Sequence, residues 1–265
     1  GNTVTGSRVI DGKTYYFNQD GSVGTAYSNR ADSIIFDNGK ARYITPAGEI
    51  GRSIFVYNPA TKAWNYFDKE GNRVTGRQYI DGHLYYFKED GSQAKGEIIE
   101  ENGIKYYYEP ETGILASGRY LQVGDDQWMY FKQDGSLAIG QVRADHGYLK
   151  YFDKNGIQVK GKTVVEDGKT YYYDAHSGAL VTSSFAEIAP NQWSYFNTDG
   201  QALKGKWTIN GKEYYFDQNG IQYKGQAVKV GSRYKYYDEN DGQPVTNRFA
   251  QIEPNVWAYF GADGY

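Results

Sequence analysis

The sequence predicts an all-β protein, an elongated β-solenoid of stacked β-hairpins with about three hairpins to each turn. The first observation is a repeat. From residue 65 on, two or three aromatic residues followed by a polar stretch and Gly return every 20–23 residues, as in "YYFKEDG" at 85–91. Such a period indicates units that stack on their neighbours. The second observation is that every third unit carries a Trp, at steps of 64 or 65 residues: Trp64, Trp128, Trp193 and Trp257.

Each unit is interpreted as a β-hairpin. The Tyr-Phe segment forms the first strand, the Asp-, Asn- and Gly-rich stretch after it forms the turn, and a second short strand follows. A four-residue loop at 153–156 would place Phe152 opposite Ile157 on one face and Tyr151 opposite Gln158 on the other. One hairpin is not stable alone in water, so the units are expected to share a narrow core.

Composition argues against several classes of function. The 265 residues include 28 Tyr and 33 Gly but no Cys, so neither a disulfide nor a thiolate nucleophile is available. The net charge of −3 gives no driving force for binding nucleic acid, and no run of 18 apolar residues predicts membrane insertion. The three His residues lack metal-ligand spacing, and no nucleophile–base set is recognisable. We therefore expect no catalytic residue, no metal and no cofactor.

The whole chain, 1–265, is expected to be one repeat solenoid. It is degenerate or irregular over 1–56, where "RYITPAG" at 42–48 is a degraded copy, and regular over 57–265. Because the chain begins without Met and stops just after a repeat, we interpret it as a fragment of a larger protein.

A Gln and a Lys two residues apart recur at the same interval as the Trp residues: Gln93 and Lys95, Gln158 and Lys160, Gln222 and Lys224. With three hairpins to a turn, these pairs would stack one turn apart. Gln offers two donors and an acceptor, and Lys offers three donors. These groups suit the hydroxyls of a pyranose, while an aromatic ring suits its C–H face. The alternative is that the pairs are solvated surface residues copied by duplication. Other units carry different residues there, such as Leu137 and Ile139, so the hairpin does not require the pair.

The segments "IDGKTYYFNQDGS", "FDKNGIQVKGK" and "INGKEYYFDQNGIQYKGQ" resemble the YG-type repeats in the glucan-binding domains of glucansucrases, enzymes of glycoside hydrolase family 70. The resemblance covers nearly the whole chain. It implies a secreted or cell-surface β-solenoid of a Gram-positive bacterium, attached to a sucrose-dependent glucosyltransferase. It also implies pockets for α-glucan (dextran or isomaltooligosaccharides), each with a stacking aromatic residue beside Gln and Lys. The residues to which we carry this role are Tyr86, Gln93, Lys95, Tyr107, Tyr151, Gln158, Lys160, Tyr172, Tyr215, Gln222, Lys224 and Tyr236.

Other functions stay open at this point. Similar aromatic hairpin repeats occur in choline-binding cell-wall modules and in the receptor-binding repeats of large clostridial toxins, and a spacer rod without any ligand is a further alternative. A choline site needs a cage of aromatic rings around a quaternary ammonium, which the Lys of each Gln–x–Lys pair would repel.

Overall fold

The computed structural model describes residues 4–11, 13–17, 21, 32–37 and 39–265. Part of the region predicted to be degenerate, 1–56, therefore lies outside the described residues. In the described part, the regular structure is β-strand except for one short 3-10 helix, η1 (Asp145–Gly147). None of the helices among these residues has the length and apolar character needed to cross a membrane.

Consecutive strands pair into two-stranded sheets, which make twelve hairpins in the described residues. The strands are β1 (Gly6–Ile10), β2 (Lys13–Phe17), β3 (Ser33–Asp37), β4 (Lys40–Ile44), β5 (Ile54–Asn58), β6 (Ala63–Phe67), β7 (Gly76–Ile80), β8 (His83–Phe87), β9 (Glu97–Glu101), β10 (Ile104–Tyr108), β11 (Arg119–Gly124), β12 (Gln127–Phe131), β13 (Gly140–Arg143), β14 (Leu149–Phe152), β15 (Lys162–Glu166), β16 (Lys169–Tyr173), β17 (Ser184–Ala189), β18 (Gln192–Phe196), β19 (Gly205–Ile209), β20 (Lys212–Phe216), β21 (Gln226–Val230), β22 (Arg233–Tyr237), β23 (Arg248–Glu253) and β24 (Val256–Phe260).

The hairpin turn lies before the Tyr-Phe segment, which corrects the prediction that placed it after that segment. Strands β7 and β8 pair antiparallel and are joined by Asp81 and Gly82. Both turn residues have positive φ, 48° and 85°. Two-residue turns of this kind match the twist of the strands and favour Asp-Gly or Asn-Gly. The turn signal in the sequence is therefore the "DG" or "NG" dipeptide that precedes many of the Tyr-Phe segments.

From β6 to β22, the segment after each Tyr-Phe strand pairs with that strand through a single isolated bridge. Gln158 pairs with Phe152, and the other two Gln residues pair with the equivalent Phe residues. The prediction that placed Gln158 opposite Tyr151 is therefore wrong by one residue. The connection holds five residues instead of four, and the Asp153 N–H donates to the Ile157 carbonyl at 2.8 Å. Because a one-residue shift moves a side chain to the opposite face, the Gln side chain faces the interior.

The core is built from the last aromatic ring of each Tyr-Phe strand. Ten of these rings among the described residues are 0–3% exposed: Phe67, Phe87, Tyr108, Phe131, Phe152, Tyr173, Phe196, Phe216, Tyr237 and Phe260. In most of the described hairpins, the Tyr just before the buried ring packs on the buried ring of the following hairpin. Tyr107 stacks on Phe131 with centroids 5.6 Å apart, and Tyr172 stacks on Phe196 at 6.0 Å. Within each of the two compact units, ring contacts therefore join neighbouring hairpins.

Two of the three buried Tyr rings, Tyr173 and Tyr237, use the hydroxyl group that a Phe would lack. The Tyr237 hydroxyl donates to Glu213 Oε1 at 3.0 Å, and Gln141 Nε2 donates to the Tyr173 hydroxyl at 3.0 Å. Burial raises the pKa of Tyr173 to about 12, so the phenol stays neutral at physiological pH. A Phe at either position would leave a polar side chain of the preceding hairpin without this partner.

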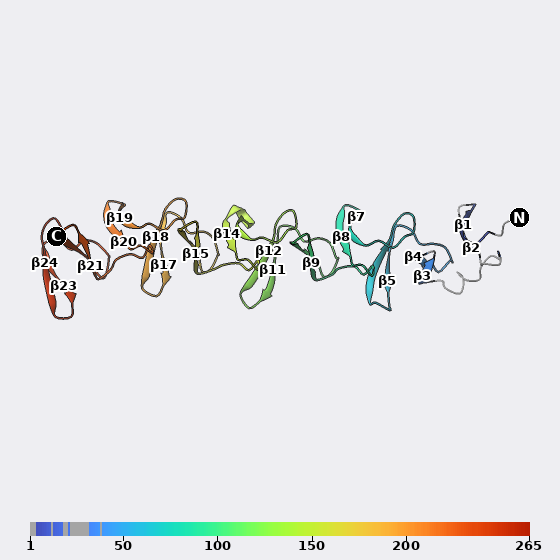
Figure 1. Ribbon diagram of the computed structural model, residues 1–265, viewed down its shortest axis with the longest axis horizontal. Coiled ribbons are helices and arrows are strands. Elements are labelled where there is room, and N and C mark those ends of the chain that lie inside the picture. Colours follow the sequence, from blue (N-terminus) through green and yellow to red (C-terminus); the bar gives the residue numbers. More distant parts are fainter. Residues whose placement is uncertain (1–3, 12, 18–20, 22–31, 38) are drawn as a thin grey trace. The chain divides into compact units, whose positions relative to one another are not determined.

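Contacts divide the chain into two compact units, Gly1–Arg119 with Phe131–Leu137 and Tyr120–Tyr130 with Ala138–Tyr265. Within the second unit, the hairpins β17–β18 and β23–β24 project to one side in Figure 1, while β14 and β19–β20 lie on the opposite side. The same direction returns at every third hairpin. This arrangement confirms the prediction of an all-β solenoid with about three hairpins to a turn.

Candidate functional site

Each Gln–x–Lys segment is bonded to the Trp-bearing strand of the preceding hairpin. The Gln222 backbone N–H donates to the Trp193 carbonyl at 2.7 Å, and Gln93 makes the same bond to Trp64, also at 2.7 Å. The middle pair makes it at 2.8 Å. The Trp and the Gln therefore recur at the same interval because the two residues meet across neighbouring hairpins. In the third pair the indole ring is also close, since Lys224 Nζ lies 5.8 Å from the centroid of Trp193.

The three Gln side chains are buried. Their exposed fractions are 6% for Gln93, 9% for Gln158 and 7% for Gln222. Each amide nitrogen lies against a Gly in the loop that follows the Tyr-Phe strand of the next hairpin, where the Cβ of an Ala would fall 2.1–2.2 Å from Nε2. Gln93 Nε2 also donates to the carbonyl of Thr112 in that turn, at 3.1 Å. The Gln side chains therefore have a structural role in the repeat, which holds whether or not a ligand is present.

The third Gln–x–Lys pair lies in a groove with an aromatic wall. A cavity of about 300 Å³ is lined by Phe185, Trp193, Tyr214, Gln222, Lys224, Asn240 and Asp241. The three rings come from strands β17, β18 and β20, and the two last residues come from the turn after β22. Lys224 Nζ donates to the Asn240 carbonyl at 3.1 Å and lies 5.8 Å from the centroid of Trp193. The groove thus combines flat apolar rings with amide, ammonium and carbonyl groups.

The hairpins of the first pair carry aromatic residues at the same positions as those of the third. Phe55 packs edge-on to Tyr85 with centroids 5.4 Å apart, as Phe185 packs on Tyr214 at 5.0 Å in the third. Trp64 stands at the position equivalent to Trp193 and is 39% exposed. Two of the three Gln–x–Lys pairs are therefore accompanied by a Phe, a Trp and a Tyr in equivalent positions.

The middle pair lies beside a cavity of different composition. Its volume is about 520 Å³, and its lining includes Gln158 and Lys160. The other lining residues are Asp126, Gln127, Asp153, Ile157, Val159, Lys162, Ala175 and His176. No Phe, Tyr or Trp belongs to this lining. Gln158 Nε2 is also buried without a hydrogen-bond partner, in contrast to the equivalent atom of Gln93.

The six Tyr residues expected to stack on sugar all pack against rings of the core or are themselves buried. Three of them, Tyr107, Tyr172 and Tyr236, are 7% exposed. The other three pack on the buried Tyr of the next hairpin with centroids 5.6–5.9 Å apart: Tyr86, Tyr151 and Tyr215. Their sugar-binding role stays a prediction. The lining of the third groove contains Gln222 and Lys224 but neither Tyr215 nor Tyr236.

Sequence reasoning did not select the aromatic residues that line the third groove. Tyr214 is the residue before the Tyr that was selected, and alternation along a strand places it on the opposite face. Phe185 stands opposite Tyr195 in the register of β17 and β18. The signal that could have found this groove is the common interval of Trp193 and Gln222 with their equivalents, because that interval reflects the bond between them.

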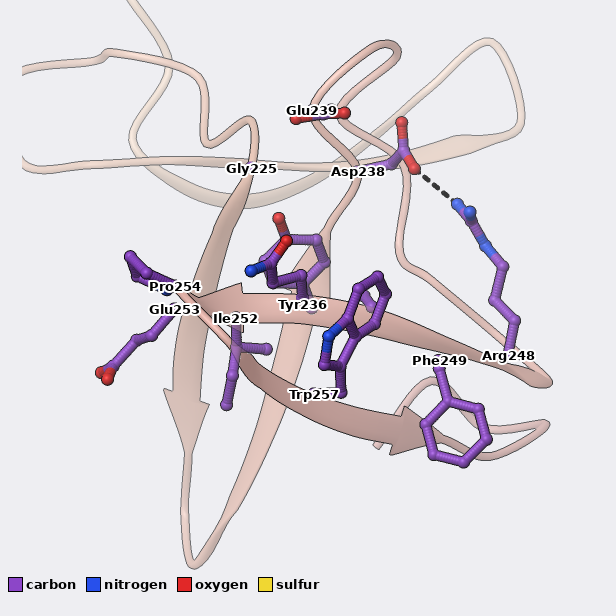
Figure 2. A pocket seen from close by; sticks show the side chains of 12 residues that line it. Gly225, Tyr236, Asp238, Glu239, Arg248, Phe249, Ile252, Glu253, Pro254 and Trp257 are labelled. Carbon is purple, nitrogen blue, oxygen red and sulfur yellow. Dashed lines mark hydrogen bonds and ion pairs between the residues drawn. The ribbon is translucent and has the colours of Figure 1, made fainter.

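A further cavity of about 540 Å³ lies between the β21–β22 and β23–β24 hairpins (Figure 2). Trp257 and Ile252 contribute apolar surface, Tyr236 also lines it, and Arg248 forms an ion pair with Asp238. A hydrogen bond from the Asn240 backbone N–H, together with Arg248, lowers the pKa of Asp238, so this carboxylate is charged at neutral pH. No Gln–x–Lys pair lines this cavity.

Metal ligation has no support in the described part of the chain, where no group of three or more His, Cys, Asp and Glu side chains could hold a metal ion.

Comparison with family models identifies choline-binding repeats in this chain. The model of a choline-binding repeat matches residues 74–120, 145–185 and 205–249, which together make up half of the chain. The model of a cell wall binding repeat matches residues 10–23 and 184–202. Repeats of this kind are modules that bind carbohydrate or cell wall, and this coarse function applies to the chain.

The chain is also similar to parts of much longer proteins. It is 32% identical to Glucosyltransferase-S of Streptococcus mutans serotype c over 251 residues, which is 94% of this chain and 17% of that protein. It is 34% identical to Glucosyltransferase-I of Streptococcus downei over 270 residues, 100% of this chain and 16% of that protein. Among solved structures, choline binding protein F from Streptococcus pneumoniae aligns with a TM-score of 0.58 at 19% identity, covering 96% of this chain and 99% of that one. The structural likeness shows the fold alone.

Proposed function

This chain belongs to the choline-binding repeat family, and from that premise we propose that it is a non-catalytic module that binds α-glucan, such as dextran or isomaltooligosaccharides. The observation that carries the proposal is the groove at Gln222 and Lys224, where three aromatic rings face amide, ammonium and carbonyl groups. A pyranose presents a C–H face to such rings and hydroxyls to such polar groups. The glucosyltransferase relatives support a glucan as the ligand.

The setting of the module follows from the same relatives. Because the chain spans only 16–17% of their length, a larger glucosyltransferase that carries this module belongs to the proposal. In that setting the module would be secreted or at the surface of a Gram-positive bacterium, and it would keep polymer near a sucrose-dependent active site. An open groove of this size is expected to hold one oligosaccharide weakly, with an affinity on the order of millimolar, about −4 kcal/mol.

The name of the matching family model favours a second candidate ligand, choline. Aromatic cages bind quaternary ammonium groups through cation–π attraction. In the third groove, however, the ammonium of Lys224 already lies over the Trp193 ring at 5.8 Å. A choline cation in the same place would meet a like charge on a side chain that is itself bonded to Asn240. The geometry therefore favours a neutral ligand.

Electrophoresis in gels that contain dextran tests the proposal. We expect retardation of the wild-type chain in dextran and normal migration in gels without polysaccharide. The variant Trp193→Ala should migrate faster than wild type in dextran, because it removes the indole from the third groove. Trp207→Ala is the matched control, since Trp207 is 46% exposed and its indole N–H donates to the Lys204 carbonyl outside any Gln–x–Lys groove.

Chromatography on a choline-substituted resin distinguishes the two candidate ligands, glucan and choline. Retention on choline-substituted resin, with no retardation in dextran gels, would show that the glucan proposal is wrong. Equal dextran retardation of wild type and Trp193→Ala, with both folded by circular dichroism, would count against the third groove as the site. If the chain binds neither dextran in the gel nor choline on the resin, the remaining alternative is a spacer rod without a ligand.

A further inference from the structure

The middle Gln–x–Lys repeat differs from the other two at one position, the residue two before the buried ring of the hairpin that carries the pair. Tyr85 in the first repeat and Tyr214 in the third both pack against a Phe of the preceding hairpin. The equivalent residue in the middle repeat is Lys150, two residues before the buried Phe152. Lys150 Nζ lies 5.1 Å from the centroid of Tyr120, which occupies the place of that Phe. A cation thus replaces an aromatic ring at an otherwise conserved contact between hairpins.

A carboxylate holds this cation in place. Lys150 is 8% exposed, and its Nζ lies 2.9 Å from Asp145 Oδ1. The Tyr120 hydroxyl donates to the same oxygen at 2.6 Å. Burial alone would raise the pKa of Asp145, but the hydrogen bonds from Tyr120 and Lys150 lower it overall, so the ion pair is intact at neutral pH. Neither Lys150 nor Tyr120 lines the cavity beside Gln158.

The cluster depends on a local change in the hairpin turn. In the first and third repeats, two residues join the strands of the equivalent hairpin, as Asn210 and Gly211 do between β19 and β20. The middle repeat has η1 (Asp145–Gly147) between β13 and β14 instead. The first residue of η1 is the one that reaches Lys150 and Tyr120. The longer turn and the Lys in the strand therefore occur together.

We propose that the cluster of Tyr120, Asp145 and Lys150 removes the sugar platform from the middle repeat, so that the Gln158–Lys160 repeat does not bind the neutral glucose units that the other two repeats bind. This inference rests on the proposed function and refines it. A pyranose needs a flat apolar surface for its C–H face. The cavity beside Gln158 has Ile157, Val159 and Ala175 among its polar and charged lining residues, but no Phe, Tyr or Trp ring that could supply such a plane. Glucan binding then has two sites per chain among the three Gln–x–Lys repeats, each with its own Trp.

Nuclear magnetic resonance of the indole N–H groups tests this inference one site at a time. The chain has five Trp residues, so each signal can be assigned with single Trp→Phe variants. During titration of the whole chain with isomaltotriose, the signals of Trp64 and Trp193 should shift in a saturable way. The signal of Trp128 should stay in place, or respond with an apparent dissociation constant at least about tenfold higher. A saturable shift of Trp128 with the affinity of the other two would overturn the inference.

The second part of the test is a variant that should gain glucan binding in the middle repeat. The triple variant Tyr120→Phe, Asp145→Asn, Lys150→Tyr copies the wall of the third repeat and removes both charges together, so that no buried charge is left unpaired. We expect the Trp128 signal of this variant to respond within about threefold of the Trp193 affinity. A folded triple variant whose Trp128 signal stays silent would overturn the role given to the cluster. If the triple variant does not fold, the titration of the wild-type chain still decides.

The result also separates this inference from the proposed function. If no Trp signal shifts in the wild-type chain, the glucan-binding function fails and this inference fails with it. If Trp64, Trp128 and Trp193 all respond alike, glucan binding stands and only the inference about the middle repeat fails.

Discussion

Replacement of Gly178 by Ala should destabilise the chain more than the same replacement in an unhindered turn. Gly178 has a φ of +67°, and the new Cβ would fall 2.2 Å from Gln158 Nε2 and 3.2 Å from Lys160 Cγ. Two costs add up. The left-handed conformation costs an Ala about 1–2 kcal/mol, partly offset by about 0.4–1 kcal/mol from the less flexible unfolded chain. Displacing a Gln that is 9% exposed costs a further 1–3 kcal/mol or so, as in other overpacked sites.

Gly168 provides the matched control. Its φ is +73°, and a Cβ built there meets nothing within 4 Å, so Gly168→Ala measures the conformational cost without the clash. We expect a loss of roughly 1 kcal/mol for Gly168→Ala and of about 2–4 kcal/mol for Gly178→Ala, measured by urea denaturation followed by circular dichroism. In a Gln158→Ala background the cost of Gly178→Ala should fall to that of Gly168→Ala. Equal costs for the two Gly variants in the wild-type background would refute the placement of the Gln158 amide against Gly178.

Three further outcomes are expected. Tyr237→Phe should cost about 1.5–3 kcal/mol because the hydroxyl donates to the charged Glu213, whereas Tyr173→Phe, which loses a bond to a neutral amide, should cost about 1 kcal/mol; urea denaturation compares them. Burial would raise the pKa of Glu213, but hydrogen bonds from Lys235 and Tyr237 hold this pKa below its ordinary value of 4.5. The ionised carboxylate therefore stabilises the fold above pH 4.5, and this contribution is lost as the pH falls through the lowered pKa. Thermal melting should show a smaller loss on acidification for Glu213→Gln than for wild type, and equal losses would contradict the assignment. Long dextran should bind about 10²–10⁴-fold more tightly per molecule than isomaltotriose, because linked sites make the second binding event intramolecular; this gain should survive moderate salt, since the ligand is neutral, and a collapse of retardation in salt would contradict it.

The repeat period was sufficient to predict the fold class, because every unit repeats the same buried ring and the same stacked Tyr. The position of the hairpin within the unit was not predicted correctly. Two turns compete in the sequence: the "DG" or "NG" dipeptide before the Tyr-Phe segment and the Gly-containing stretch after it. The dipeptide before the Tyr-Phe segment joins two fully paired strands, as Asp81 and Gly82 do. The stretch after that segment leads only to an isolated bridge. The sequence alone does not rank these turns, because both contain Asx and Gly residues that favour chain reversal.

The Gln–x–Lys pairs were found by their spacing, but their faces were assigned with a register that is wrong by one residue. That error placed Gln158 beside Tyr151, although it pairs with Phe152 and is buried. The rings that line the third groove were not selected for the same reason, since the residue before the selected Tyr lies on the opposite face of the strand. The wall of a groove is also shared between neighbouring hairpins, as by Phe185 and Tyr214, which are about thirty residues apart in the sequence. A single sequence does not show which positions of neighbouring repeats meet.

The repeats separate the residues that hold the fold from those that shape the grooves. In all three Gln–x–Lys repeats the Tyr that packs on the next buried ring keeps its place: Tyr86, Tyr151 and Tyr215 lie 5.9, 5.6 and 5.9 Å from their partners. The residue before each of these is Tyr, Lys and Tyr in turn, yet the ring contacts of the core do not change. The core contacts are unaffected because adjacent residues of a strand face opposite sides, so the residue before the Tyr points away from the core contact that the Tyr makes. The chemistry of a groove can therefore change in one repeat while the solenoid is preserved, so the number of ligand sites need not equal the number of Gln–x–Lys pairs.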